Sequence, residues 1–220
     1  MFTTMKNYIG LFCISLVFII SACSNPTSNE GDITDSLDPV ENVTPITGAE
    51  NTTMNVNRGP DSYFVLGFHS VQSNDVIADG MVGEGWCIDW EKPIESNDGS
   101  YSNIPLYSTF NVESWNPLNY LLNIKEDLMN SDPELTYREI QLVVWSLRGH
   151  PEFNLEEIAL ENLPSRMRTD GEPNFSYEKV NSILEMVETG YRDFEFTEGT
   201  KYSVIAETPA DVQTVITVVE

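Results

Sequence analysis

The sequence predicts an α+β fold: a β-sandwich or barrel-like sheet with a helical insert between its N-terminal strands and a C-terminal β-hairpin. Two observations support this class. Segments rich in β-branched and aromatic residues occur early, at 62–72, 81–90 and 104–112, and return at the end, at 201–207 and 212–220. The residues between them repeat apolar positions at the three- and four-residue spacing of helices. Strands that bracket helices give a sheet with its helices gathered at one end.

The early strands are separated by turn-forming sequence. SYFVLGFHSVQ (62–72) is the first, and MVGEGWCIDW (81–90) is the second, weakened by its glycines. Residues 91–103 form a turn-rich loop before the third strand, IPLYSTFNV (104–112). The loop segment ESNDGSYSN (95–103) has acidic groups for weak calcium binding, but it lacks the regular spacing of a calcium loop.

The first predicted helix begins with Asn116 as its N-cap and Pro117 at its first position. Its buried face is apolar except for one lysine and consists of Leu118, Leu121, Leu122, Lys125, Leu128 and Met129. A short helix is predicted over 155–163. A later one follows the cap Ser176 and ends near Gly190, with an apolar stripe of Tyr177, Val180, Ile183, Leu184 and Val187.

The most clearly bounded helix is predicted over residues 137–147. Thr136 and Glu139 form a capping box at its start, and Gly149 and Pro151 end it. Gln141 lies at the border of its apolar face, one turn before Trp145. Leaving a buried amide without partners costs about 1–3 kcal/mol, so this glutamine needs hydrogen-bond partners or a covalent bond.

The N-terminus is predicted to be a targeting segment. Lys6 precedes an apolar stretch at 8–20 that is short for a membrane span. Ile20-Ser21-Ala22-Cys23 then resembles the lipobox of bacterial lipoproteins. That resemblance implies a signal peptide at 1–22, a diacylglyceryl lipid on Cys23 and an extracytoplasmic protein at the cell surface, anchored to the cell membrane or outer membrane. An ordinary secretory signal cleaved nearby is the alternative.

The remaining chain divides into a linker and a domain. Residues 23–60 are rich in Ser, Asn, Thr, Pro and acidic residues, which predicts a disordered tether, and 61–220 form the folded domain. The chain of 220 residues has a formal net charge of −24. Such a surface repels nucleic acid and anionic headgroups, so no nucleic-acid partner is expected. The acidity favours solubility and also fits a high-salt habitat.

Three cysteines leave one thiol for the domain. Cys13 is removed with the signal and Cys23 is lipidated, so Cys87 in GWCIDW has no cysteine partner in the chain. Exported proteins usually pair their thiols. Cys87 is therefore a buried inert residue, a partner in an interchain disulfide, or a reactive nucleophile.

Two motifs resemble the thioester domains of bacterial surface adhesins. The first is Trp86-Cys87-Ile88-Asp89, and the second is IQLVVW at 140–145, in which Trp145 follows Gln141 by four residues. The intervening NPLNYLLNIKEDL resembles the family's helix before the glutamine motif, and the resemblance covers about 63–220. It implies an internal thioester between Cys87 and Gln141, formed with loss of ammonia. A lysine amine on a partner displaces the sulfur, so the protein acts once as an adhesin and is not a turnover enzyme.

Other residues have secondary roles in this hypothesis. Trp86, Trp90 and Trp145 are core residues that also form an apolar wall against water. Asp89, two residues after the cysteine in a strand, is expected on the same face, where it helps to position the site. Thr136 is better explained as a helix cap.

Competing assignments stay open at this stage. Gln213, in VQTVI, is a second glutamine among apolar residues, but no tryptophan follows it by four positions. His150 is either a base near the site or a surface residue after a helix stop, and His69 is structural. Neither a metal nor a cofactor is predicted, because no close ligand cluster occurs. Two other functions remain: a non-covalent binding domain of the same fold, and a Cys–His hydrolase or acyltransferase using Cys87 and His150.

Overall fold

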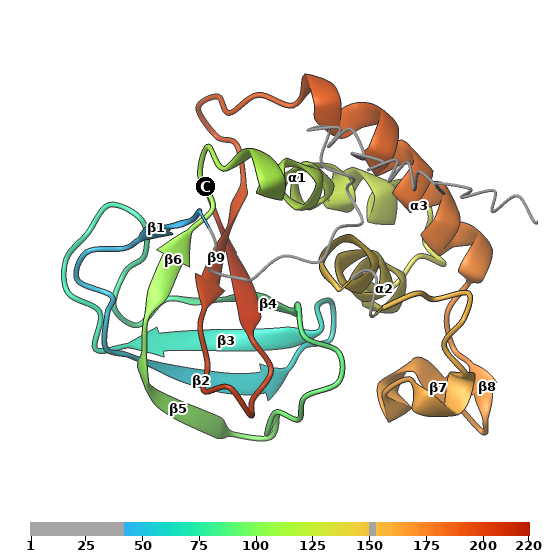
Figure 1. Cartoon of the computed structure of the whole chain (residues 1–220), viewed down its shortest axis with the longest axis horizontal. Coiled ribbons are helices and arrows are strands. Elements are labelled where there is room, and N and C mark those ends of the chain that lie inside the picture. Colours follow the sequence, from blue (N-terminus) through green and yellow to red (C-terminus); the bar gives the residue numbers. More distant parts are fainter. Residues whose placement is uncertain (1–41, 150–152) are drawn as a thin grey trace, which may run out of the picture. The chain divides into compact units, whose positions relative to one another are not determined.

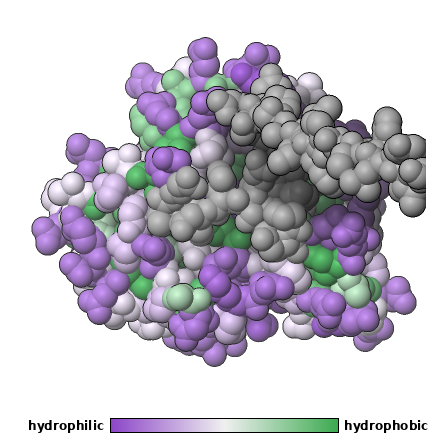
Figure 2. Space-filling view, viewed as in Figure 1, coloured by the Kyte–Doolittle hydropathy of each residue, from purple (hydrophilic) through white to green (hydrophobic). Residues whose placement is uncertain are grey.

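A computed structural model describes residues 42–149 and 153–220. The predicted signal peptide, the predicted lipidation site Cys23, most of the predicted linker and His150 lie outside the described residues. Within them, no helix is both long and apolar enough to cross a membrane. On the face that Figure 2 shows, hydrophilic side chains project over the described surface, with smaller apolar areas between them.

The fold is built on one antiparallel sheet of eight strands (Figure 1). Its spatial order is β1-β6-β9-β10-β4-β3-β2-β5. In chain order the strands are β1 (Thr44–Pro45), β2 (Thr52–Arg58), β3 (Phe64–His69), β4 (Val82–Cys87), β5 (Gly99–Ile104), β6 (Leu106–Ser108), β9 (Tyr202–Ala206) and β10 (Val215–Val219). The last two form the predicted C-terminal hairpin.

The sheet curls on itself. Only Pro105 separates β5 from β6, yet β5 is at one edge of the sheet and β6 is next to the opposite edge. A chain can connect the two ends through one residue only if the sheet bends round to bring them together. Backbone hydrogen bonds of Leu106 with Ile46 and Ala49 close this region, each at 3.0 Å. The predicted α+β class with a barrel-like sheet is confirmed.

The predicted linker boundary at residue 60 is wrong. Strand β2 lies inside the sheet, between β3 and β5, and β1 pairs with β6. Thr52, Met54 and Val56 are fully buried, whereas the polar residue that follows each of them is only half-buried. This alternation is that of a strand with one face in the core. The polar side chains of its other face gave the segment the composition of a linker.

Three helices lie between β6 and β9, as the predicted insert requires. They are α1 (Asn116–Ser131), α2 (Tyr137–Arg148) and α3 (Tyr177–Gly190), and they pack against one another (Figure 1). Helix α1 contacts β9 and α2 contacts β4. The N-cap of α1 is Trp115, after a 3-10 turn over Glu113–Trp115, so the prediction of Asn116 as the cap was one residue late.

Two further predictions need correction. Residues 155–163 do not form an α-helix; the segment contains turns and a 3-10 helix, Leu160–Asn162, because nine residues give an isolated helix few hydrogen bonds. It leads through Ser165–Met167 to a small hairpin of β7 (Arg168–Thr169) and β8 (Glu172–Pro173). Strand β5 begins at Gly99, inside the predicted loop 91–103, and the predicted strand 104–112 is shorter.

Helix α2 is buried on almost every side. All six residues from Ile140 to Trp145 have no exposed surface. Its N-terminus has the predicted capping box, with Thr136 as N-cap. Glu139 is only 3% exposed and accepts hydrogen bonds from Thr136 N, Thr136 Oγ1 and Ser176 N, at 2.9, 2.7 and 2.9 Å. One carboxylate therefore caps α2 and ties it to the start of α3.

We expect Glu139→Ala to lower the free energy of unfolding by about 3 kcal/mol, because it leaves three donors without their buried acceptor. Urea denaturation measures this. Glu185→Ala, which removes an exposed carboxylate from α3, is the matched control and should change stability by less than about 0.5 kcal/mol. Equal effects of the two substitutions would contradict the assigned role of Glu139.

Candidate functional site

The structure brings Cys87 and Gln141 together. Cys87 is the last residue of β4, Gln141 lies in the second turn of α2, and neither has exposed surface. The Cys87 N–H donates to Gln141 Oε1 at 2.9 Å, and Gln141 Nε2 donates to the Cys87 carbonyl at 2.7 Å. The buried amide is thus paired at both its oxygen and its nitrogen, and its carbonyl carbon is held beside the residue that carries the thiol.

The glutamine amide takes the place of a neighbouring strand. Pairing of β3 with β4 stops at Phe64 opposite Gly85, whereas β10 continues, with Val215 opposite Cys87. The next amide, Ile88 N–H, donates to Thr214 on the β10 side. Because backbone groups alternate in direction along a strand, the N–H and C=O of Cys87 point to the side that β3 has left. Gln141 satisfies both groups there.

The thiol itself is buried and neutral. Cys87 Sγ donates to the carbonyl oxygen of Asp89 at 2.6 Å. Burial raises the pKa of the Cys87 thiol far above its usual range, and the charge of Asp89 raises it further. The Trp145 side chain, the Asp89 backbone and Lys92 oppose this shift only in part. At neutral pH the site therefore contains a protonated thiol and no preformed thiolate.

Asp89 shapes the site through its backbone. Strand β4 ends at Cys87, so the expectation that Asp89 shares a strand face with the cysteine does not apply. Its carbonyl accepts the thiol hydrogen, while its carboxylate accepts from Thr214 N at 2.9 Å and from Lys92 Nζ at 3.1 Å. These bonds fix the turn after β4 to the start of β10. Asp89 thus holds the acceptor of the thiol in place.

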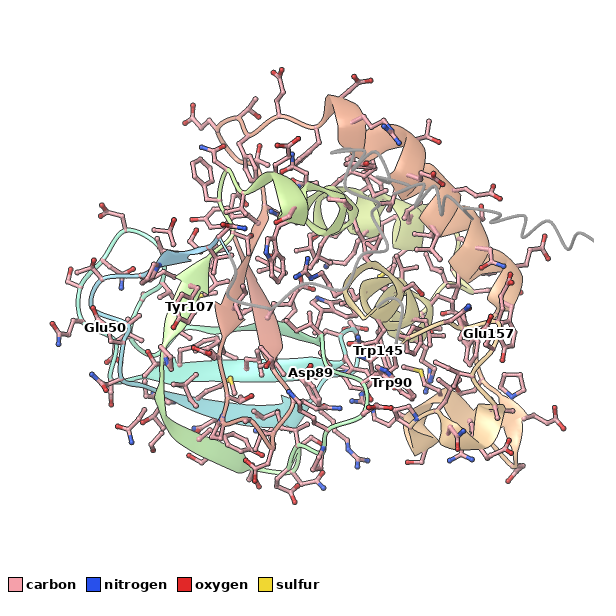
Figure 3. The ribbon with its side chains drawn as sticks, in the orientation of Figure 1. Glu50, Asp89, Trp90, Tyr107, Trp145 and Glu157 are labelled. Atoms are coloured by element: carbon pink, nitrogen blue, oxygen red, sulfur yellow. The ribbon has the colours of Figure 1, made fainter. Side chains whose placement is uncertain are left out.

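A row of aromatic side chains extends past the site. The ring centroids of Trp90 and Phe153 are 5.4 Å apart, those of Phe153 and Trp145 are 5.5 Å apart, and those of Trp145 and Tyr63 are 5.4 Å apart. Figure 3 labels Trp90 and Trp145 beside Asp89. Trp90 is partly exposed, and the other three are buried. The Trp145 Nε1–H has no hydrogen-bond partner of normal geometry among the described residues, yet the indole is close enough to the sulfur to lower its pKa.

Trp86 is not part of this row. It precedes Cys87 in β4, so its side chain points to the opposite face of the strand. There Lys125 Nζ from α1 lies 5.8 Å from the centroid of the Trp86 ring and 2.6 Å from Glu84 Oε2. Trp86 is fully buried and packs as a core residue, which corrects its prediction as a wall of the site.

The other candidate residues lie elsewhere. Gln213 is buried, its backbone bonds to Pro93 and Thr208, and no hydrogen bond joins its side chain to Cys87 among the described residues. His69 is exposed at the end of β3. In the described parts of the chain, no group of three His, Cys, Asp or Glu side chains is arranged to hold a metal.

Sequence reasoning missed Tyr63 and Phe153. Burial, and then the nearby Cys87, raise the pKa of the Tyr63 hydroxyl. Tyr63 precedes β3 and Phe153 follows α2, and neither belongs to a motif. Only the tertiary fold brings Tyr63 near the cysteine and Phe153 against Trp145, so no local signal in the sequence could have identified them.

Comparison with known proteins gives one similar structure and no family. No family model matches the chain, and no curated protein matches it in sequence. Among solved structures, the N-terminal thioester domain of fibronectin-binding protein SfbI from Streptococcus pyogenes is similar, with a TM-score of 0.39 and 13% identity. The match covers 77% of this chain and 93% of that one. A likeness at this level identifies neither a family nor an activity.

The paired amide predicts a pH-dependent effect of Gln141→Glu, tested in a Cys87→Ala background that has no thiol. An ionised carboxylate at this position cannot donate to the backbone carbonyl of residue 87, so the fold would favour the protonated acid and raise its pKa above the unfolded value of about 4.3. The folded state then binds more protons than the unfolded state, and stability falls as pH rises above that value. We expect a loss of about 2–4 kcal/mol at neutral pH, where the shift acts fully, and a smaller loss near pH 4.5.

Urea denaturation of the single and double variants at both pH values measures this difference. At each pH, the double variant is compared with Cys87→Ala alone, so the effect of pH on the rest of this acidic chain cancels. An effect of Gln141→Glu that does not change with pH would contradict the described hydrogen bond to the Cys87 carbonyl.

Proposed function

We propose that this protein is a lipid-anchored surface protein that forms an internal thioester between Cys87 and Gln141 and uses it to capture an amine, such as a lysine, on a partner. The observation that carries the proposal is the pair of hydrogen bonds that holds the buried Gln141 amide against Cys87. The lipid on Cys23 and the location outside the cytoplasm rest on the signal sequence alone.

Bond formation needs only groups already present. Cys87 Sγ attacks the Gln141 side-chain carbonyl carbon, the C–N bond breaks, and the nitrogen leaves as ammonia with the thiol proton. The Cys87 N–H, 2.9 Å from Gln141 Oε1, is a donor at the oxygen on which negative charge develops. The fold supplies proximity, which replaces a bimolecular encounter by an internal one. No cofactor takes part.

Capture of a partner consumes the thioester. The partner's amine nitrogen attacks the same carbonyl carbon, the C–S bond breaks, and a proton from the amine returns to the sulfur. The product is an amide between the Gln141 side chain and the partner, with a free Cys87 thiol. This nucleophilic acyl chemistry happens once for each molecule, so it is capture and not turnover.

The surroundings favour a long-lived bond. Trp145 is buried beside the thiol, Phe153 is buried against Trp145, and the partly exposed Trp90 packs on Phe153. Exclusion of water protects an activated acyl group from hydrolysis. Burial also makes the thiol a poor leaving group, because thiols of high pKa leave slowly.

Intact-mass spectrometry of residues 24–220, which contain every described residue and Cys87 as the only cysteine, tests the proposal. We expect a mass lower than that of the sequence by one ammonia, and no titratable thiol in denaturant. Cys87→Ala and Gln141→Ala should each restore the full mass. An isopeptide bond between Gln141 and Lys125 would lose the same ammonia but leave the thiol free, so thiol titration separates the two bonds.

A full mass together with a titratable thiol would contradict the thioester proposal. A non-covalent binding domain of the same fold would then be the remaining function. Turnover of ester substrates would instead support the Cys–His hydrolase. Methylamine provides a positive check, because it should add to Gln141 and release the Cys87 thiol.

Removal of Trp90, the partly exposed member of the aromatic row, should shorten the lifetime of the thioester. We expect the thioester of Trp90→Ala to hydrolyse about tenfold faster than that of the wild type, which corresponds to about 1.4 kcal/mol in the barrier. Loss of the mass deficit with time at fixed pH measures this rate. Phe110→Ala, which removes an aromatic side chain that is 46% exposed and packs on Phe196 and Tyr202, is the control and should leave the rate unchanged.

A further inference from the structure

The basic residues of this acidic protein fall into two groups. Each of the four described lysines pairs with a carboxylate, in the pairs Lys92–Asp89, Lys125–Glu84, Lys179–Asp132 and Lys201–Glu126. None of the described arginines forms an ion pair with another described residue, although the chain has 35 acidic residues. The arginines are Arg58, Arg138, Arg148, Arg166, Arg168 and Arg192.

Three of these arginines gather around Tyr63, the end of the aromatic row beside Cys87. The Arg166 guanidinium lies 4.2 Å from the centroid of the Tyr63 ring and donates to the Tyr63 carbonyl. Arg58 lies opposite Phe64, the neighbour of Tyr63, in the pairing of β2 with β3, and its Nε donates to Ser96 Oγ at 3.4 Å. Arg138 donates to the Arg166 carbonyl at 3.0 Å. We call Arg58, Arg138 and Arg166 the arginine cluster.

The arginine cluster keeps hydrogen-bonding capacity for a ligand. Arg138 and Arg166 lie over the Tyr137 ring, at 4.7 and 5.0 Å from its centroid, so cation–π contacts hold their guanidinium groups in place. Both side chains are half-buried, and Arg58 is exposed. Arg138 and Arg166 each donate to one backbone carbonyl, and the remaining N–H groups of a guanidinium match the two oxygens of a carboxylate.

We propose that the arginine cluster docks an acidic protein segment and so selects target lysines that have Glu or Asp neighbours. A peptide supplies both the amine for the thioester and carboxylates for the arginines. The net charge of −24 opposes such a partner at long range, but exposed charges beyond about 8 Å are largely screened at physiological salt. At contact distance the arginines therefore dominate. Covalent selection rests on the proposed function, whereas docking itself does not.

Three peptides of equal length test the covalent step, each with one central lysine flanked by Glu, by Ser or by Arg. Residues 24–220 are incubated with each, and adducts are counted by intact mass. We expect the Glu peptide to couple about tenfold faster than the Ser peptide at about 0.15 M salt, and the difference to shrink at about 1 M salt. The Arg peptide should be the slowest.

Substitutions then locate the effect. Arg58→Gln combined with Arg138→Gln should remove most of the advantage of the Glu peptide and leave the methylamine rate unchanged, because methylamine has no carboxylate. Arg192→Gln is the matched control. It removes another arginine that has no ion pair among the described residues. Arg192 directly follows the C-terminal end of α3, whereas Ser176 caps the other end of that helix. It should change neither rate.

The outcomes separate this inference from the proposed function. Equal coupling of the three peptides, with normal methylamine reaction, overturns the docking surface and leaves the thioester. If no thioester forms, non-covalent docking can still be tested. Fluorescence anisotropy measures the affinity of the labelled Glu peptide for the Cys87→Ala chain. Binding that the double arginine substitution weakens several-fold supports the surface, and its absence overturns it. Stronger competition by a sulfated polysaccharide than by the Glu peptide would overturn the assignment to a protein segment.

Discussion

The hydrogen bonds between Gln141 and the backbone of Cys87 follow from a constraint on helix α2. Because α2 is surrounded by β4, α1 and α3, a polar side chain in its middle has no access to water. An unpaired amide there would cost about 1–3 kcal/mol, as would unpaired backbone groups at the end of β4. The early end of β3 leaves the Cys87 backbone open, and Gln141 fills that place. Each group satisfies the other, so the contact is required by folding before any chemistry is considered.

The same contact fixes the geometry of the site. A strand end and a capped helix have little freedom, and both participating backbone groups belong to the residue that carries the thiol. Glu139 adds to this rigidity by joining the first turn of α2 to α3. Sites on such elements hold reacting atoms more accurately than sites on loops. The structural role and the proposed chemical role of Gln141 therefore support each other.

Sequence reasoning succeeded where the signals were local. The Thr136–Glu139 capping box, the cap at Ser176 and the C-terminal hairpin each depend on residues close together in the chain. It failed at β2, because a strand with one polar face has the composition of a linker. It also failed for residues 155–163, where the segment is too short for its helical spacing to specify a helix. Cys87 and Gln141 were selected by resemblance to known motifs, and their approach across 54 positions depends on the tertiary fold.

The aromatic row and the arginine cluster show the limit of such reasoning. Tyr63 precedes β3, Tyr137 and Trp145 lie on α2, and Phe153 follows that helix, and no local sequence signal links Tyr63 or Phe153 to Trp145. Under the proposed function, the aromatic row would protect the thioester, and the arginine cluster would select the partner. In the proposed reaction, the apolar surroundings of Cys87 exclude water and make its sulfur a poor leaving group, so attack by water and by amines would both be slow. Selectivity would then require a high local concentration of the correct amine, and the proposed docking of an acidic segment on the arginine cluster would raise that concentration for a protein but not for water.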